Sequence, residues 1–367
     1  MTHLAPINVA FQYGHIVATG GIGSGIFFLL EGNQTLGRNE SRMASLLPYK
    51  DYCKQHIILH YVAVLLGGGN HFKVFPIGKV GADKTGDEMI AMMNSAGMDT
   101  QHVFRSPAKP TMFSVCYQYA DHSGGNITTS GSACEEVRAA DIESFFNTFQ
   151  QPESRGVALA VPEVPLEARI SLLTEGRNKG YLNVACVQSA EVSDFIDRGG
   201  IPLTDVLSVN IDEAKALLQV DEHLHEPASL AKLCHNKLKE LNPQILLLMT
   251  AGKQGVYLCQ GEGDPEFTPA LEMPVVSTAG AGDAFLAGFI CGLCCGLPSR
   301  RSYSLQTLDR KLSTAVDLGL LVASLSVTSP DTINTSISAE NIVQLITERK
   351  LMMEDSFAAL FTSKLQS

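Results

Sequence analysis

The chain has 367 residues, 45% of them hydrophobic, and a formal net charge of -11 at pH 7. This length allows one large α/β domain or two smaller ones, and the apolar content is sufficient for a substantial core. The excess of acidic residues and the absence of Trp argue against a broad basic face, so nucleic acid is not an expected partner.

Targeting signals are not evident. The N-terminal residues MTHLAPINVAFQYGH contain no basic segment followed by an apolar run, and the apolar stretch 286–297 is 12 residues long, against about 20 needed to span a bilayer. We therefore expect a cytoplasmic protein with no membrane partner. The nine cysteines are scattered and odd in number, which predicts reduced thiols, and the CxxCC string at 291–295 is interpreted as small core residues.

The N-terminal part of the chain begins with an α/β pattern. Residues 15–21 and 73–81 are predicted strands, and residues 89–95 form a predicted helix that Gly97 would end. Between the two strands lies the glycine-rich run GGIGSG, but its spacing does not produce GxGxxG, so a dinucleotide-binding dehydrogenase is not expected.

A small β flap is predicted next. Residues 113–119, FSVCYQY, alternate with a period of two, and the turn DHSGGN follows them. A strand pair with one polar face inside an α/β pattern is typical of a flap that closes over a substrate. We assign the flap to about residues 22–45 and 111–130, and expect its apolar face to allow a homodimer.

The rest of the chain alternates strands and helices. Strands are predicted at 157–161, 205–209 and 244–249, and helices at 166–179, 211–218 and 227–241. This alternation predicts a mainly parallel sheet with helices on both faces. The polar stretch 298–306 is the sole candidate linker, and we predict a single domain over residues 1–367.

The sequence STAGAGDAF, residues 277–285, is the most informative motif. Apolar residues recur at helical spacing after it, which predicts a buried helix starting near Ala281. Amides at a helix start have no internal partners, and small residues there let a phosphate oxygen approach the backbone. Asp283 would lie beside that anion and accept a proton from an attacking hydroxyl. The alternative is a glycine-rich turn in which Asp283 only complements the helix dipole.

Two further motifs follow predicted strands directly. NIDE places Asn210 and Glu213 at the carboxyl edge of the sheet, where open α/β folds bind ligands, although Asn-x-x-Glu is also the spacing of a helix-capping pair. TAGKQG places Thr250, Gly252 and Gly255 at the same edge, although a turn before a short strand explains it as well. The segment 77–89, IGKVGADKTGDEM, has a glycine turn before a helix but lacks the P-loop spacing.

These four motifs, in this order, resemble the PfkB family of carbohydrate kinases over most of residues 15–345. The resemblance implies a ribokinase-like three-layer α/β/α fold, with a mainly parallel central sheet and the flap as a lid. It also implies an ATP-dependent phosphotransferase that uses Mg²⁺ and transfers the γ-phosphate to a hydroxyl of a sugar or sugar-like molecule.

The family's roles transfer to matching residues. Asp283 would be the catalytic base, with an anion hole formed by Gly280, Ala281 and Gly282. The expected nucleotide-binding residues are Asn210, Thr250, Gly252 and Gly255. Glu213, together with Asn210, would hold Mg²⁺, partly through water.

The chain also departs from the family pattern. The usual signature DTTGAGD has Ser277 and Ala279 in place of its first Asp and second Thr. At the acceptor end, residues 20–26 (GGIGSGI) lack the usual Asp, and residues 53–58 (CKQHII) replace a GGxxxN turn. Candidate substrate contacts near these segments are Ser24, Arg38, Lys54 and His56.

Several alternatives follow from these departures. The basic candidates would suit an anionic or unusual acceptor, or they are ordinary surface charges. A nucleoside kinase of the same fold is the alternative enzyme. A non-catalytic PfkB-like protein that binds a ligand for regulation is the alternative outside enzymes: the retained GAGD turn argues against it, and the altered acceptor segments favour it.

Overall fold

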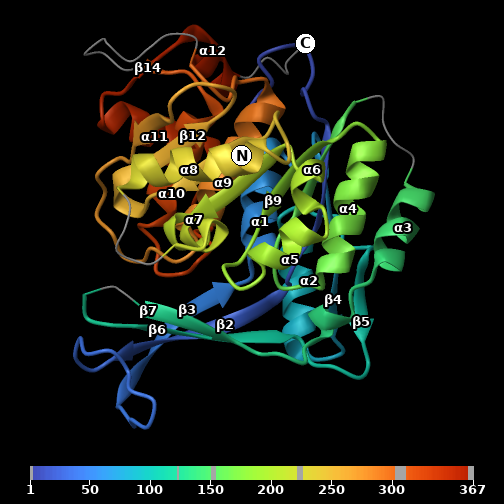
Figure 1. Cartoon of the computed structure of the whole chain (residues 1–367), viewed down its shortest axis with the longest axis vertical. Coiled ribbons are helices and arrows are strands. Elements are labelled where there is room, and N and C mark those ends of the chain that lie inside the picture. The colour runs from blue at the N-terminus through green and yellow to red at the C-terminus, as the bar shows by residue number, and fades with distance from the viewer. Residues whose placement is uncertain (1–2, 122–123, 150–153, 221–225, 302–310, 363–367) are drawn as a thin grey trace.

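The computed structural model describes residues 3–121, 124–149, 154–220, 226–301 and 311–362. In these ranges the chain folds as a large sheet between two helical layers, with a smaller sheet projecting from the body (Figure 1). Part of the candidate linker, residues 302–306, and residues 122–123 of the predicted flap lie outside the described ranges.

The central sheet has nine strands in the order β13-β12-β11-β10-β9-β8-β1-β4-β5. The strands are β1 (His15–Thr19), β4 (Lys73–Gly81), β5 (Val103–Ser106), β8 (Gly156–Ala160), β9 (Leu182–Cys186), β10 (Val206–Asn210), β11 (Leu246–Thr250), β12 (Gly255–Cys259) and β13 (Glu266–Pro269). The strands from β11 to β5 in this order pair in parallel, whereas β12 and β13 pair in antiparallel fashion at one edge. The predicted mainly parallel sheet is confirmed.

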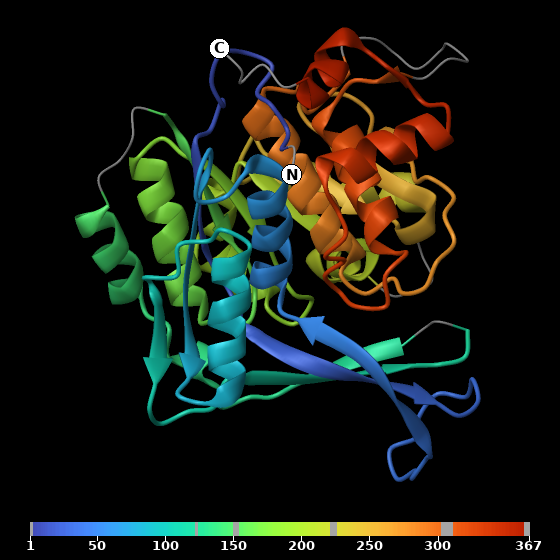
Figure 2. The ribbon, with the colours of Figure 1, turned by 180° about the vertical axis from the view of Figure 1, so that it is seen from behind.

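Helices cover both faces of this sheet, as Figures 1 and 2 show from opposite sides. One layer contains α1 (Lys54–Leu66), α2 (Lys84–Ser95), α9 (Ala281–Cys295), α10 (Ala315–Ser326), α11 (Ala339–Glu348) and α12 (Asp355–Ala358). The other contains α3 (Ala139–Thr148), α4 (Leu166–Asn178), α5 (Val192–Asp197), α6 (Gly200–Leu203), α7 (Ile211–Leu218) and α8 (Pro227–Lys239). The three-layer α/β/α fold is thereby confirmed.

The two layers explain why the strands are apolar along their whole length. Ile16 and Ala18 of β1 pack in one hydrophobic core, and Val17 between them packs in the other. Because alternate side chains of a strand point to opposite faces, a strand covered on both sides needs apolar residues at every position. The continuous apolar runs in the sequence are therefore the signature of this sandwiched sheet.

The smaller sheet forms a lid, with strand order β3-β2-β6-β7. Its strands are β2 (Gly23–Leu30), β3 (Ala44–Tyr52), β6 (Met112–Gln118) and β7 (Gly124–Thr128). β3 continues to Tyr52, beyond the expected limit of residue 45, and α1 starts at Lys54. The acceptor-end segment 53–58 therefore lies where the lid joins the body.

Helix α2 begins earlier than predicted, at Lys84 rather than Met89. The side chain of Asp83 accepts a hydrogen bond from the Gly86 amide and so caps the helix. This cap stabilises a first helical turn that has little apolar character, so the apolar pattern in the sequence did not predict it. All nine cysteines are free and buried, as expected from their scattered positions. None of the described helices is long and apolar enough to cross a membrane.

Candidate active site

Asp283 lies in the first turn of α9, as the sequence predicted. The helix starts after Gly280, whose φ of 77° is in the left-handed region that glycine adopts readily. Asp283 is 9% exposed, and its Oδ1 atom accepts a hydrogen bond from Lys54 Nζ at 3.3 Å. Burial raises the pKa of Asp283, and the ammonium of Lys54 opposes that effect. The structure thus gives the candidate base a cationic partner from α1.

The backbone at the start of α9 is only partly available to an anion. The amide of Ala281 donates a hydrogen bond of 3.3 Å to the Thr278 carbonyl, and the amide of Ala279 donates to Ser277 Oγ at 3.3 Å. Among the described residues, the amides of Gly280 and Gly282 have no backbone partner. These two amides, at the positive end of the helix dipole, are the groups best placed to receive a phosphate oxygen.

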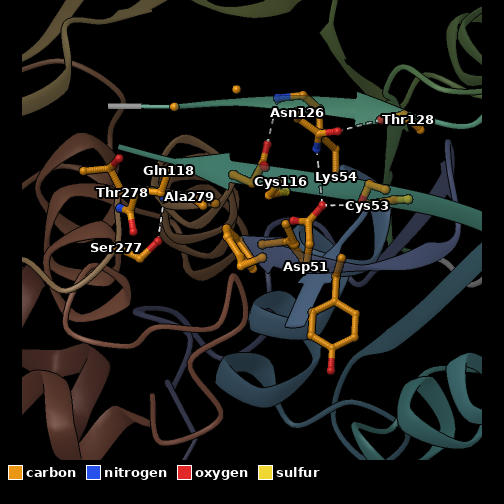
Figure 3. Close-up of a pocket in the computed structure, with 18 of the residues that line it drawn as sticks. Asp51, Cys53, Lys54, Cys116, Gln118, Asn126, Thr128, Ser277, Thr278 and Ala279 are labelled. Carbon is orange, nitrogen blue, oxygen red and sulfur yellow. Dashed lines mark hydrogen bonds and ion pairs between the residues drawn. The ribbon is translucent and has the colours of Figure 1, made fainter. Parts of the chain in front are cut away.

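A cavity of about 350 Å³ lies between the lid and the start of α9 (Figure 3). The lid contributes Phe27, Asp51, Tyr52, Ser114, Cys116, Tyr117, Gln118, Gly124, Gly125, Asn126 and Thr128. The body contributes Cys53, Lys54, Ile57, Glu163, Ser277, Thr278, Ala279, Gly280 and Asp283. The cavity therefore joins the candidate base to a polar face of the lid.

Asp51 is the central polar residue of the lid face. Its Oδ2 atom accepts hydrogen bonds from Ser114 Oγ at 2.5 Å and from Asn126 Nδ2 at 3.3 Å. The three residues come from β3, β6 and β7, and they meet because Gly25 of β2 pairs with both Asp51 and Ser114. A Cβ atom on Gly25 would lie 2.0 Å from Ser114 Oγ, so glycine is required beneath this cluster.

Glu163 follows β8 and reaches the cavity from the central sheet. Its φ of 78° is uncommon for a residue with a side chain. Its Oε2 atom is buried, and among the described residues it has no hydrogen-bond partner. Burial raises the pKa of Glu163 to about 7. A Cβ atom on Gly21 would lie 2.4 Å from Oε2, so this glycine leaves the space that the carboxyl group occupies.

Asn210 and Glu213 form the capping pair that the sequence also allowed. Asn210 Oδ1 accepts a hydrogen bond from the Glu213 amide at 2.9 Å, and Glu213 Oε2 accepts one from the Asn210 amide at 2.8 Å. Burial raises the pKa of Glu213, and the positive charge of Lys54 opposes this. The pair caps α7 at the carboxyl edge of the central sheet.

The remaining nucleotide-binding candidates lie on the neighbouring strand and turn. Thr250 ends β11 directly opposite Asn210 of β10. Gly252 and Gly255 follow it, with φ of 53° and 133°. A Cβ atom on Gly255 would lie 2.1 Å from the Thr268 carbonyl oxygen, so the turn itself demands this glycine. These residues do not line the cavity.

Three candidate substrate residues are placed away from the cavity. Ser24 precedes Gly25 on β2, so the alternation of a strand directs it to the opposite face of the lid from Asp51. Arg38 lies on the exposed segment between β2 and β3. His56 is fully buried in α1, where burial lowers its pKa to about 3. Of the four candidates, Lys54 alone lines the cavity, and a substrate role for the other three stays a prediction.

Sequence reasoning did not single out the acidic residues that the structure brings to Lys54. Glu163 had a usable signal, because it follows a predicted strand in the same way as Asn210 and Thr250. Asp51 had none, since only the pairing of the lid strands shows that it meets Ser114 and Asn126, which are 63 and 75 residues away.

Comparison with known proteins identifies the family. The model of the pfkB family carbohydrate kinases matches residues 60–339. The chain belongs to this family of carbohydrate kinases. The match spans the second half of α1, most of the central sheet and the whole GAGD segment, and it confirms the resemblance inferred from the motifs.

Individual members of the pfkB family are distant from this chain. The 2-dehydro-3-deoxygluconokinase of Thermoproteus tenax is 25% identical over 65% of this chain and 73% of its own length. A ribokinase of Cryptococcus neoformans, crystallised with ADP, aligns with a TM-score of 0.70 and 19% identity over 90% of this chain and 99% of its own. A putative ribokinase II of E. coli in complex with ATP and Mg²⁺ gives a TM-score of 0.67 and 15% identity, covering 91% and 99% of the two chains.

Proposed function

We propose that this protein is an ATP-dependent phosphotransferase that moves the γ-phosphate of ATP to a hydroxyl of a sugar or sugar-like molecule. The observation that carries the proposal is the position of Asp283, in the first turn of α9 and on the wall of a cavity that the lid covers. A general base for phosphoryl transfer needs a carboxylate beside both the acceptor and an anion-binding helix start.

The chemistry follows from this arrangement. The acceptor hydroxyl oxygen attacks the γ-phosphorus, Asp283 takes the hydroxyl proton, and the bond between the γ-phosphorus and its bridging oxygen breaks to release ADP. The amides of Gly280 and Gly282 stabilise charge on the transferring group, together with Ala281 if its bond to Thr278 is released. Lys54 keeps Asp283 ionised before the acceptor binds.

ATP and Mg²⁺ are the proposed cofactors. Asn210, Thr250, Gly252 and Gly255 would hold the nucleotide at the carboxyl edge of β10 and β11. Glu213 and Asn210 offer the oxygen atoms that Mg²⁺ prefers. The described part of the chain has no cluster of three acidic, His or Cys side chains for a metal, which fits an ion held largely by phosphates and water. When bound, Mg²⁺ would neutralise charge on the triphosphate.

Replacing Asp283 with Asn tests the proposal. We expect Asp283→Asn to lower kcat by about 10²- to 10⁴-fold, because the amide cannot accept the proton while its shape is kept. The measurement is ATP consumption with magnesium against sugars, sugar phosphates, polyols and nucleosides. Asp87→Asn is the matched control, since Asp87 lies in the first turn of α2 with its side chain 67% exposed. Unchanged turnover in Asp283→Asn would contradict the proposal.

The same screen separates the two alternative functions. Turnover confined to nucleosides would favour a nucleoside kinase of this fold. If no acceptor is consumed but sugars or nucleotides raise the melting temperature, a regulatory ligand-binding protein is favoured. The altered segment 53–58 is the reason to retain the regulatory alternative. Its Lys54 forms an ion pair with Asp283, the proposed base, in the described structure.

We also propose a homodimer formed through the lid. Its face away from the cavity exposes Leu46, Phe113 and Ile127, with exposed fractions of 62%, 36% and 63%. Leu46 lies on β3, Phe113 on β6 and Ile127 on β7, so the apolar side chains extend across the sheet. A second lid would remove this surface from water.

A further inference from the structure

The cavity is lined by more acidic than basic side chains. Asp51, Glu163 and Asp283 line it, whereas Lys54 is the one basic residue among the described lining residues. The ammonium of Lys54 is already bound to Asp283 at 3.3 Å. No ion pair within the described residues reaches Asp51 or Glu163. Two carboxyl groups therefore face the acceptor space without a cationic neighbour in contact.

Asp51 is held in a fixed orientation toward this space. Ser114 Oγ and Asn126 Nδ2 both donate to its Oδ2 atom, and the residue is 7% exposed. A carboxylate has about four lone-pair positions, so two donors leave capacity for a ligand. Figure 3 shows Asp51 linked to the lid strands beside Asn126, with Lys54 and Cys116 close by. The lid thus presents an oriented acceptor of hydrogen bonds.

Glu163 brings a second carboxyl group to the cavity wall, from the side of the central sheet. Its Oε2 atom is buried without a hydrogen-bond partner among the described residues. A Cβ atom on Gly21 would lie 2.4 Å from Oε2, so this oxygen packs against Gly21, while the residue as a whole lines the cavity. Asp51 on the lid side and Glu163 on the side of the central sheet therefore both bring a carboxyl group to the cavity wall.

We propose that Asp51, oriented by Ser114 and Asn126, selects acceptors that offer hydroxyl or amino donors and rejects acceptors that carry a carboxylate or phosphate. This inference rests on the proposed function and names the class of its acceptor. A neutral polyol or amino sugar donates to Asp51. An anionic group at the same place meets the negative charge of Asp51 at short range, and the two repel each other in a site shielded from water.

The placement of the other basic residues supports this choice. Arg38 lies on the exposed segment between β2 and β3, and neither it nor His56 lines the cavity. Neither side chain can offset the carboxyl groups in the described conformation. On this basis the chain should differ from its relative in Thermoproteus tenax, a kinase named for a sugar acid.

The test uses matched sets of compounds with one carbon skeleton. Glucose, glucosamine, gluconate and glucose 6-phosphate form one set, and ribose, ribonate and ribose 5-phosphate form another. Binding is measured by calorimetry and by thermal shift, and turnover by ATP consumption. We expect the neutral or amino member of the preferred set to bind at least about 10-fold more tightly than its acidic members. Equal or tighter binding of the acid or phosphate overturns the inference.

Variants assign the discrimination to Asp51. We expect Asp51→Asn to raise the acceptor KM by about 10- to 100-fold, to change kcat by less than about 3-fold, and to leave the KM for ATP unchanged. Asp51→Asn should also reduce the ratio by which the neutral compound of a set binds more tightly than the acidic one. Ser114→Ala, which keeps the charge but removes a positioning donor, should raise the same KM by a smaller factor.

Glu31→Gln is the control, because Glu31 is an exposed acid just beyond β2 and does not line the cavity. If both Asp51→Asn and Ser114→Ala behave like Glu31→Gln, the inference is wrong. Failure of the proposed function looks different: no compound then drives ATP consumption that depends on Asp283. In that case the binding data still decide the inference, since neutral compounds must bind more tightly and lose this advantage in Asp51→Asn.

Discussion

Two residues decide whether the site is in a reactive state, Asp283 and Lys54. Burial and the negative charge of Asp51 raise the pKa of Asp283, and Lys54 lowers it. A general base must be ionised, so activity should be lost as the pH falls through the pKa of Asp283. The ammonium of Lys54 extends the active range toward acid pH.

We therefore predict that Lys54→Met moves the acid limb of the pH profile of kcat/KM to higher pH. The substitution removes the charge that lowers the pKa of Asp283 and leaves burial and Asp51 to raise it. Lys50→Met is the control, because Lys50 is an exposed lysine on the neighbouring lid strand β3 and does not line the cavity. A limb that stays in place, or moves to lower pH, would show that Lys54 does not control the ionisation of the base.

At the scale of the element, the start of α9 depends on two glycines with different roles. Gly280 has a φ of 77°, and a Cβ atom on it would lie 2.7 Å from the Thr332 carbonyl oxygen. Gly282 lies inside the helix, and a Cβ atom there meets nothing within 4 Å. The fold therefore requires glycine at position 280, whereas packing places no constraint on the residue at position 282.

This difference predicts opposite effects on stability. Gly280→Ala should lower the free energy of unfolding by about 1–2 kcal/mol or more, because a left-handed conformation and a backbone contact both oppose the methyl group. Gly282→Ala should leave it unchanged or raise it by up to about 1 kcal/mol, since alanine favours a helix over glycine. Urea unfolding of the two variants measures this. Equal destabilisation by both would contradict the described start of α9.

The lid strand β3 and helix α1 together build the acceptor side of the cavity. β3 ends at Tyr52 and α1 begins at Lys54, so Asp51 and Lys54 lie on either side of a short junction. In the sequence, residues 53–58 stand out because they replace the GGxxxN turn of the family. The sequence did not show that a lid strand, β3, ends and a helix, α1, begins at this point. The altered segment contains Lys54, and Asp51 lies just before it, so the lid face and the neighbourhood of the base adjoin along the chain.

For the whole molecule, buried histidines link stability to pH. Burial lowers the pKa of His56 to about 3 and of His15 and His60 to about 4. Both ring nitrogens of His56 are without a hydrogen-bond partner among the described residues. Because the unfolded chain binds protons near the ordinary pKa of about 6.5, the folded state loses stability as the pH falls below that value.

We predict that His56→Leu reduces this loss. At pH 5 one histidine kept neutral by folding costs about 2 kcal/mol, from about 1.4 kcal/mol per pH unit below 6.5. Wild-type protein should therefore lose about 2 kcal/mol more than His56→Leu between pH 7 and pH 5, as measured by urea unfolding. His71→Leu is the control at an exposed histidine. An equal loss in wild type and His56→Leu would show that His56 is not held neutral.

The proposed dimer also belongs to the whole molecule. We expect sedimentation to show dimers at micromolar concentration, because pairing of two lids buries the exposed Leu46 and Ile127. The double variant Leu46→Glu and Ile127→Glu should be monomeric and still folded, since neither residue is in the core. A wild-type protein that sediments as a monomer throughout would exclude this interface.

The sequence by itself determined the sandwiched parallel sheet, the family and the local geometry around Asp283. It did so because apolar runs report burial on both faces, and because a helix start is built from consecutive residues. Only the tertiary structure decided what surrounds Asp283. Lys54 meets it from 229 residues away, and Asp51 meets Ser114 through strand pairing. Register determines which face each side chain occupies, so Ser24 and Asp51 could be told apart only after the strands were paired.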